Sequence, residues 1–320
     1  MKGPRPTLRS QAREGTPDAA IRVRVPATSA NLGPAFDCAG LALTCHDVVE
    51  FTVVPDGLTV EVEGIGAGDL PTDESHLVVR AVRAACAELG WTPPGLRVVA
   101  ENGIPQGRGM GSSAAAVVAG VLGAWALCPR VETIDPDAVL RLVTELEGHP
   151  DNVAACLLGG ATLSWMTAAG ARAARLEVEP SIRPTLLVPP GTLSTHLARG
   201  LLPDVVPHAD AAHAAGRAAL LVHALTAEPS LLLDATEDRL HQRQRAGGMP
   251  ESLDLVDRLR ARGLAAVVSG AGPSVLVLAG TGDAAEEAAD LVPNSWTAMH
   301  LEVDSQGARL LADGSEVSSA

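Results

Sequence analysis

A short stretch that alternates glycine with polar residues carries the clearest chemistry in this sequence. Residues 103–116 read GIPQGRGMGSSAAA, so Gly107, Gly109 and Gly111 alternate and two serines precede an apolar run. Glycine lets backbone N–H groups close around an anion, and a helix that starts at Ser112 would add its unpaired N–H groups at the same point. The pattern favours a phosphate-binding loop. A flexible turn before a core helix explains the glycines about equally well when they are taken alone.

Two polar segments could bind a second reactant. The segment PATSANLGPAFD carries Asn31 and Asp37 on one irregular loop, where they could hold a polar, cationic group. Ordinary turn chemistry is the alternative explanation for both residues. In STHLAR, Thr195 and Arg199 stand one helical turn apart, so both could face one carboxylate, with Arg199 bidentate. The alternative there is the start of a surface helix.

Two more clusters interrupt the apolar sequence. The segment ELEGHPDN, residues 145–152, holds three carboxylates, an imidazole and an amide. These groups supply metal ligands and hydrogen bonds to a substrate, although a solvated helix end would contain the same residue types. The segment SGAGPS, residues 269–274, is a glycine turn between two apolar runs. It could press against a ligand phosphate or against the phosphate loop, or be a tight hairpin.

Apolar patterning indicates the elements that must position these residues. Leu96–Glu101 is strand-like and leads into the glycine-rich segment, and Ser112–Leu127 and Asp135–Glu147 are predicted to be helices. Val48–Val54 and Leu58–Glu63 are predicted to form a hairpin around a Pro-Asp-Gly turn. Strands and helices alternate without the strict rhythm of a doubly wound sheet, so the predicted fold class is α+β.

Composition narrows the classes of function. The chain has 320 residues, of which 47 % are hydrophobic and 2 % aromatic, and tyrosine is absent. Its net charge of −14 repels nucleic acid and anionic membranes, and the few aromatic rings nearly exclude base stacking. The five cysteines are scattered, which favours free thiols in a reducing cytosol. The longest apolar run, Ala114–Cys128, is too short to span a bilayer.

Taken in order, these motifs resemble those of the GHMP kinases, the superfamily that includes galactokinase and the homoserine, mevalonate and phosphomevalonate kinases. The resemblance rests on PATSANLGPAFD near the start, PQGRGMGSSAA in the first half and SGAGPS near the end. Their spacing agrees from Ile21 to Val303, across nearly the whole chain. EGHPDNVAACLLGG and STHLAR narrow the resemblance to the homoserine branch. Each motif alone is modest, whereas the ordered set is specific.

The resemblance implies an enzyme that uses ATP and Mg²⁺ to phosphorylate the side-chain hydroxyl of L-homoserine, giving O-phospho-L-homoserine on the threonine biosynthesis route. It also implies a two-subdomain fold. An N-terminal, ATP-binding α/β subdomain would cover residues 21–170 and a C-terminal, ferredoxin-like α+β subdomain residues 171–310. Residues 1–20 are expected to be a disordered tail, and residues 311–320 a second tail. We expect a cytoplasmic homodimer that takes a small-molecule substrate and binds neither nucleic acid nor membranes.

The resemblance also implies roles for individual residues. The loop that wraps the ATP phosphates would comprise Pro105, Gln106, Gly107, Arg108, Gly109, Met110, Gly111, Ser112, Ser113, Ala114 and Ala115. The metal ligands would be Ser112, with Ser113 as an alternative, and Glu147. The substrate would contact Asn31, Asp37, His149, Thr195, Arg199 and Arg245, although Arg243 is close enough to leave the register of the last arginine open. Asp151 and Asn152 would be catalytic, with Asp151 a candidate base.

Two positions depart from the family pattern. Ala35 stands where the family usually has glycine, and it would be strained by roughly 1 kcal/mol or more if the loop needs a positive φ there. Met110 replaces the usual leucine, an apolar exchange that we expect to be mild. Two alternatives to the proposed activity stay open: a GHMP kinase for threonine or mevalonate, and a nucleotide-binding protein without catalysis. The presence of Ser112, Glu147 and both arginines favours an enzyme.

Overall fold

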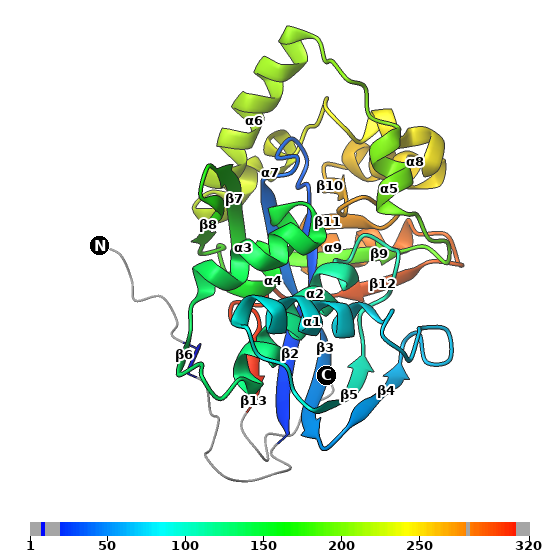
Figure 1. Ribbon diagram of the computed structural model, residues 1–320. Coiled ribbons are helices and arrows are strands. Elements are labelled where there is room, and N and C mark those ends of the chain that lie inside the picture. Colours follow the sequence, from blue (N-terminus) through cyan, green and yellow to red (C-terminus); the bar gives the residue numbers. More distant parts are fainter. Residues whose placement is uncertain (1–7, 10–19, 280–281, 312–320) are drawn as a thin grey trace.

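The computed structural model describes residues 8–9, 20–279 and 282–311, and Figure 1 shows how their elements are arranged. The predicted tails at residues 1–20 and 311–320 lie almost entirely outside these ranges. Inside the first predicted tail, the described residues Leu8–Arg9 form the short strand β1, which pairs with β6 (Thr133–Ile134). All five cysteines are free thiols, as the composition predicts. Among the described helices, none is long and apolar enough to cross a membrane.

A seven-stranded sheet forms the first unit. Its main path runs β13 (Arg309–Leu311), β2 (Ile21–Ala30), β3 (Ala39–Val54), β5 (Gly95–Asn102) and β4 (Gly57–Gly64). The strand β7 (Ala161–Thr167) pairs with the start of β3, and β8 (Gly170–Leu176) pairs with β7. Every pair is antiparallel except β4 with β5. The sheet therefore joins segments from both ends of the described chain.

The predicted hairpin around Pro55-Asp56-Gly57 is wrong. The strands β3 and β4 follow each other along the chain, but β5 lies between them and pairs with both. A turn signal reports a local reversal of the chain, whereas the choice of a strand partner depends on distant residues. Here β5 returns after the helix α1 (Leu77–Leu89) and occupies the place that the hairpin would have used.

The helix α2 (Ser112–Leu127) is the centre of the first unit and spans the residues predicted for it. It packs against α1, α3 (Pro136–Glu147), α4 (Pro150–Leu158) and the strands β2 and β3 (Figure 1). Nearly every residue from Ala114 to Ala126 is buried, because alanine, valine and glycine let neighbouring elements approach on all sides. The body of α2 is therefore enclosed by the elements that pack against it.

The second unit has ferredoxin-like topology. In chain order it contains β9 (Arg183–Val188), helices, β10 (Ala265–Val268), β11 (Val275–Ala279), α9 (Gly282–Asp290) and β12 (Thr297–His300). The sheet order is β10-β11-β9-β12 and all pairs are antiparallel, which is the βαββαβ arrangement. The helical segments between β9 and β10 are α5 (Thr195–Gly200), α6 (His208–Thr226), η1 (Pro229–Leu231), α7 (Leu232–Ala235), η2 (Arg243–Gly248) and α8 (Pro250–Ala261).

This architecture confirms the predicted α+β fold with two subdomains. The subdomain limits at residues 170 and 310 stay predictions. At both limits, strands of the first sheet are present: β8 crosses residue 170 and pairs with β7, and β13 pairs with β2. The return of the chain through β13 places residues 301–304 beside the first unit, where Leu43 and Val303 form an isolated bridge.

Candidate active site

The glycine-rich loop lies between β5 and the amino-terminal end of α2. Gly109 and Gly111 both have φ of 68°, a left-handed conformation that glycine adopts with little strain. A Cβ at Gly111 would overlap the Thr28 hydroxyl, and one at Gly109 would overlap the Ser269 carbonyl. These two glycines are therefore required both by backbone conformation and by the segments that pack against the loop.

Three motifs that are far apart in the sequence meet at this loop. The Thr28 N–H donates to the Met110 carbonyl at 2.9 Å, and the Gly270 N–H donates to the Ala30 carbonyl at 2.9 Å. The Ser269 hydroxyl donates to the Gly109 carbonyl at 2.6 Å. The segment 269–274 thus presses against the phosphate loop, one of the roles considered for it from the sequence.

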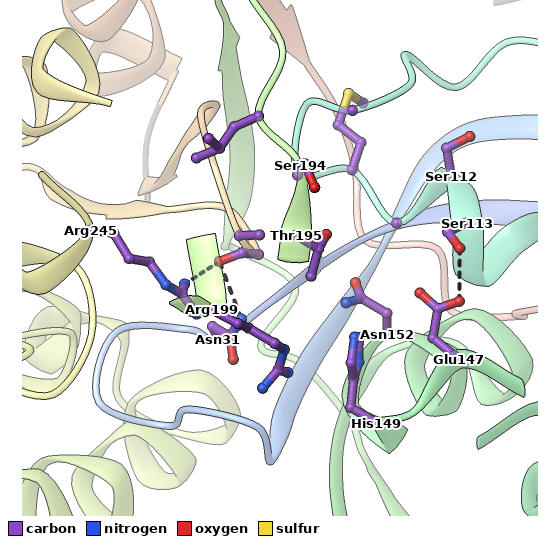
Figure 2. A pocket seen from close by; sticks show the side chains of 17 residues that line it. Asn31, Ser112, Ser113, Glu147, His149, Asn152, Ser194, Thr195, Arg199 and Arg245 are labelled. Atoms are coloured by element: carbon purple, nitrogen blue, oxygen red, sulfur yellow. Dashed lines mark hydrogen bonds between the residues drawn. The ribbon is translucent and has the colours of Figure 1, made fainter. Parts of the chain in front are cut away.

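These contacts enclose a cavity of about 180 Å³ at the amino-terminal end of α2. Figure 2 shows Arg199 and Arg245 toward one end of it, Ser113 and Glu147 toward the other, and His149 and Asn152 between them. Thirteen of its lining residues carry roles in the sequence-based prediction: Asn31, Gly107, Gly109, Met110, Gly111, Ser112, Ser113, Glu147, His149, Asn152, Thr195, Arg199 and Arg245. The others are Leu193, Ser194, Gly270 and Ala271.

A second cavity of about 300 Å³ adjoins the first and shares Gly107, Ser112 and Ser113 with it. Its wall is largely apolar, and the predicted loop residues Gln106 and Ala115 belong to it. The remaining lining residues are Val25, Asp47, Val49, Leu70, Pro71, Ser75, His76, Leu77, Val78, Asn102 and Ala116. The phosphate loop therefore separates two chambers of different character.

Ser113, at the start of α2, forms a hydrogen-bonded pair with Glu147, at the end of α3. The Ser113 hydroxyl donates to Glu147 Oε2 at 2.8 Å, so Ser113, the alternative to Ser112, is the serine in contact with this carboxylate. Burial raises the pKa of Glu147, although the Ser113 hydrogen bond opposes the shift. A partly buried carboxylate of this kind is stabilised in its charged form by a nearby cation.

His149 and Asp151 form a second pair at the start of α4. The Nδ1 atom of His149 lies 2.7 Å from Asp151 Oδ1, and that oxygen also accepts the Asn152 N–H at 2.8 Å. Burial alone would lower the pKa of His149, but the hydrogen bond and the charge of Asp151 raise it above its usual value. Asp151 is fully buried and does not line the cavity, whereas His149 does.

Asp37 and Arg199 contact each other. Two hydrogen bonds of 2.6 and 3.0 Å join the guanidinium group to the carboxylate, so Asp37 borders the cavity through Arg199. Asn31 accepts the Asp37 N–H at 2.8 Å, and both residues have a positive φ. Strained non-glycine conformations of this kind concentrate at functional sites. Ala35 is buried without a positive φ, so the strain considered for it does not arise.

The structure separates the two candidate arginines of the segment HQRQR. Arg245 is 1 % exposed and lines the cavity, whereas Arg243 is on the surface and pairs with Asp257. Arg245 donates to the Gly270 carbonyl at 3.2 Å, and no carboxylate among the described residues lies within ion-pair distance of it. Burial lowers the pKa of Arg245, and the positive charge of Arg199 adds to this effect. Among the residues that the structure describes, Arg245 is therefore a buried cation without an anionic partner.

Four of the predicted phosphate-loop and substrate assignments are not in direct contact with either cavity: Pro105, Arg108, Ala114 and Asp37. The Arg108 side chain donates hydrogen bonds to the carbonyls of Pro189 and Pro190. These hydrogen bonds join the first unit to the second. The sequence alone did not indicate Thr28, whose hydroxyl donates to Asn152 Oδ1 at 2.8 Å. It also did not indicate Asp47 and His76, which line the second cavity. Thr28 lies in a motif already identified, but nothing in the local sequence distinguishes the other two.

Asp47 anchors the start of the phosphate loop and provides a test of its electrostatics. Its carboxylate accepts the N–H groups of Gly103 and Ile104 at 2.8 and 2.9 Å. Burial nevertheless raises its pKa from 3.8 to about 6, so ionised Asp47 destabilises the folded state at neutral pH. Asn at this position keeps an acceptor for both N–H groups and carries no charge.

We expect Asp47→Asn to increase the free energy of unfolding by about 3 kcal/mol or less near pH 8. Because the folded-state pKa is the higher one, the penalty in the natural protein disappears as the pH falls through 6 toward 4. Urea denaturation of both proteins across this range measures the difference. A difference that stays constant with pH would contradict this account of Asp47.

Family models match both halves of the chain. The GHMP kinases N terminal domain matches residues 76–160 and the GHMP kinases C terminal domain matches residues 214–298. Together with the fold and the phosphate loop, these matches show that the chain belongs to the GHMP kinase family.

Relatives that match about nine-tenths of the chain are homoserine kinases. The chain is 56 % identical to the homoserine kinase of Streptomyces coelicolor over 294 residues, covering 92 % of this chain and 95 % of that protein. It is 53 % identical to that of Clavibacter michiganensis over 292 residues, covering 90 % and 92 %. A crystal structure of homoserine kinase from Cytophaga hutchinsonii has a TM-score of 0.82 at 25 % identity, covering 94 % of this chain and all of that one. The resemblance to the homoserine branch is confirmed.

Proposed function

We propose that this chain is an ATP-dependent phosphotransferase that phosphorylates the side-chain hydroxyl of L-homoserine to O-phospho-L-homoserine, a step of threonine biosynthesis. The observation that carries the proposal is the distribution of charge in the cavity. A buried arginine without a carboxylate and an Asp37–Arg199 pair lie at one end, and the amino-terminal end of α2 with Glu147 lies at the other. One end suits a zwitterionic amino acid and the other suits a phosphate.

The phosphate end needs little covalent chemistry from the protein. In phosphoryl transfer the enzyme mainly positions the reactants and neutralises charge on the phosphate oxygens. The N–H groups at the start of α2 are suited to this, because no side chain caps the helix there and the unpaired N–H groups of a helix start favour an anion. The adjoining apolar chamber, which includes Val49, Leu70 and Val78, is a suitable site for the nucleoside of ATP.

The residues at this end also fit Mg²⁺. We assign Glu147, Ser112 and Ser113 as the protein ligands, since Mg²⁺ takes one or two carboxylates and completes its shell with phosphates and water. The Ser113–Glu147 hydrogen bond already holds a hydroxyl oxygen and a carboxylate oxygen next to each other. Within the described residues, no cluster of three or more His, Cys, Asp or Glu side chains forms a separate metal site. When bound, the ion would neutralise charge on the phosphate oxygens.

At the other end, we assign Arg245 and Arg199 to the α-carboxylate and Asp37 to the ammonium group. Binding of the zwitterion exchanges the Asp37–Arg199 pair for two new pairs and supplies the anion that Arg245 lacks. Asn31 holds the Asp37 backbone, and Thr195 lines the cavity beside Arg199. With both charged ends held, the hydroxyl group is left free to point along the cavity toward the phosphate site.

For the proton of the hydroxyl group, we assign His149 as the acceptor within reach and Asp151 as the residue that orients it. This modifies the sequence-based role of Asp151 as the base itself, because its side chain is fully buried behind the imidazole. Asn152 lines the cavity, and its Oδ1 is occupied by the Thr28 hydroxyl. Its amide N–H groups can therefore donate to the substrate hydroxyl or to the transferred phosphate.

A substrate panel tests the function. ADP release is measured with purified protein, ATP and Mg²⁺, and with L-homoserine, L-threonine or mevalonate as acceptor. We expect turnover with homoserine to exceed that with the other two, because threonine carries its hydroxyl one carbon closer to the charged groups and mevalonate lacks the ammonium group. ATP binding without turnover on any acceptor would favour the alternative of a non-catalytic nucleotide-binding protein. Sedimentation and cell fractionation test the proposed homodimer and its cytoplasmic location.

A further inference from the structure

The aromatic ring of Phe36 lies against both arginines of the candidate substrate site. The centroid of the ring is 5.2 Å from Arg245 Cζ and 5.6 Å from Arg199 Cζ. Both distances fall within the range of cation–π attraction, which extends to about 6 Å from the ring centroid. Phe36 is half-buried and belongs to the loop that also carries Asn31 and Asp37. One ring thus contacts two cations from different helical segments, α5 and η2.

The two guanidinium groups are held by polar contacts that differ in partner and length. Arg199 is fixed by two hydrogen bonds to Asp37. Within the described part of the chain, the Arg245 guanidinium has only the Gly270 carbonyl at 3.2 Å and the Nδ1 atom of His241 at 3.3 Å, and its buried Nε atom has no partner there. Long hydrogen bonds of this kind fix a guanidinium group weakly. The Phe36 ring supplies a further contact for the Arg245 guanidinium group.

His241 completes the group around the ring. Its Nε2 atom lies 2.7 Å from the Gly33 carbonyl, and its ring centroid is 5.1 Å from that of Phe36. Burial lowers the pKa of His241, so the neutral ring donates from Nε2–H and offers Nδ1 as an acceptor to Arg245. His241 adds no positive charge beside the two arginines. The negative face of Phe36 therefore adds to the Asp37 carboxylate in offsetting the repulsion between the two arginines.

We propose that Phe36 is a positioning residue that holds Arg199 and Arg245 by cation–π attraction, so that both face one substrate carboxylate. The proposal rests on the proposed function, since it takes the homoserine carboxylate as the ligand of both arginines. Phe36 itself does not line the cavity. Its effect is to keep two like charges close together before the substrate arrives.

A fluorination series at position 36 tests the electrostatic part of this role. Phe36 is replaced by 4-fluoro-, 3,5-difluoro- and 3,4,5-trifluorophenylalanine, which weaken the negative face of the ring with little change in size. We expect KM for homoserine to rise stepwise, by about 5- to 30-fold over the series, if two cation–π contacts are lost. KM for ATP and kcat should stay within about twofold, because neither cation–π contact involves a residue of the phosphate loop.

Phe51, the other phenylalanine of the chain, is a matched control. It is fully buried in the core of the first unit, so the same series there should change stability and leave KM for homoserine unchanged. If the natural protein is active on homoserine but KM for homoserine does not change across the fluorinated series at position 36, the role of Phe36 alone is overturned. This conclusion holds even if Phe36→Leu raises KM by loss of volume. Failure of the natural protein to phosphorylate homoserine would overturn the proposed function, and the role of Phe36 with it.

Discussion

Arg245→Met is expected to make the protein more stable and a much poorer enzyme. Methionine fills similar volume and removes a buried charge that has no carboxylate partner, so the free energy of unfolding should rise by about 1–3 kcal/mol. The same change removes one of two groups assigned to the substrate carboxylate. We expect kcat/KM for homoserine to fall by about 10²- to 10³-fold, with KM for ATP unchanged. Denaturation curves and steady-state kinetics on one preparation measure both effects.

Arg199→Met is the matched control for this prediction. Arg199 is paired with Asp37, so its removal leaves a carboxylate unpaired and should not stabilise the protein. Kinetically the two variants should resemble each other, because both arginines are assigned to the same carboxylate. If Arg245→Met destabilised the fold as much as Arg199→Met, Arg245 would be a structural cation and its assignment to substrate would fail.

Asp151→Asn is expected to reduce kcat by about 10²-fold, the lower end of the range for a positioned general base. Asparagine can still accept the His149 Nδ1–H and the Asn152 N–H, so the orientation of the imidazole is largely kept. What it loses is the negative charge that raises the pKa of His149. Because the neutral imidazole accepts the proton, activity rises with pH through the His149 pKa. In the variant this acidic limb of the pH profile should move to lower pH.

A second buried pair provides the control for Asp151. His46 Nε2 and Asp304 Oδ2 lie 2.6 Å apart, and neither residue lines either cavity. Asp304→Asn should therefore lower stability and leave the pH profile of kcat/KM where it was. Near-full turnover of Asp151→Asn with an unchanged profile would show that the His149–Asp151 pair takes no part in proton transfer.

Features set by short-range patterning were well predicted from the sequence alone. The helix at Ser112–Leu127 begins and ends at the predicted residues, and the glycine pattern before it correctly indicated a tight loop at a helix start. The ordered motifs also indicated the GHMP kinase family, because such motifs record which side chains the chemistry needs. Periodicity, caps and motif spacing depend on neighbouring residues, which a sequence displays directly.

The tertiary structure decided matters that depend on distant partners. It placed β5 between β3 and β4, chose Arg245 over Arg243 for the cavity, and brought Ser113 rather than Ser112 into contact with Glu147. It also buried Asp151 behind His149 and set the Phe36 ring against two arginines that follow it by more than a hundred residues. Strand pairing and the direction of a side chain are fixed by packing between elements, and one residue of register decides whether a group faces the cavity or the solvent.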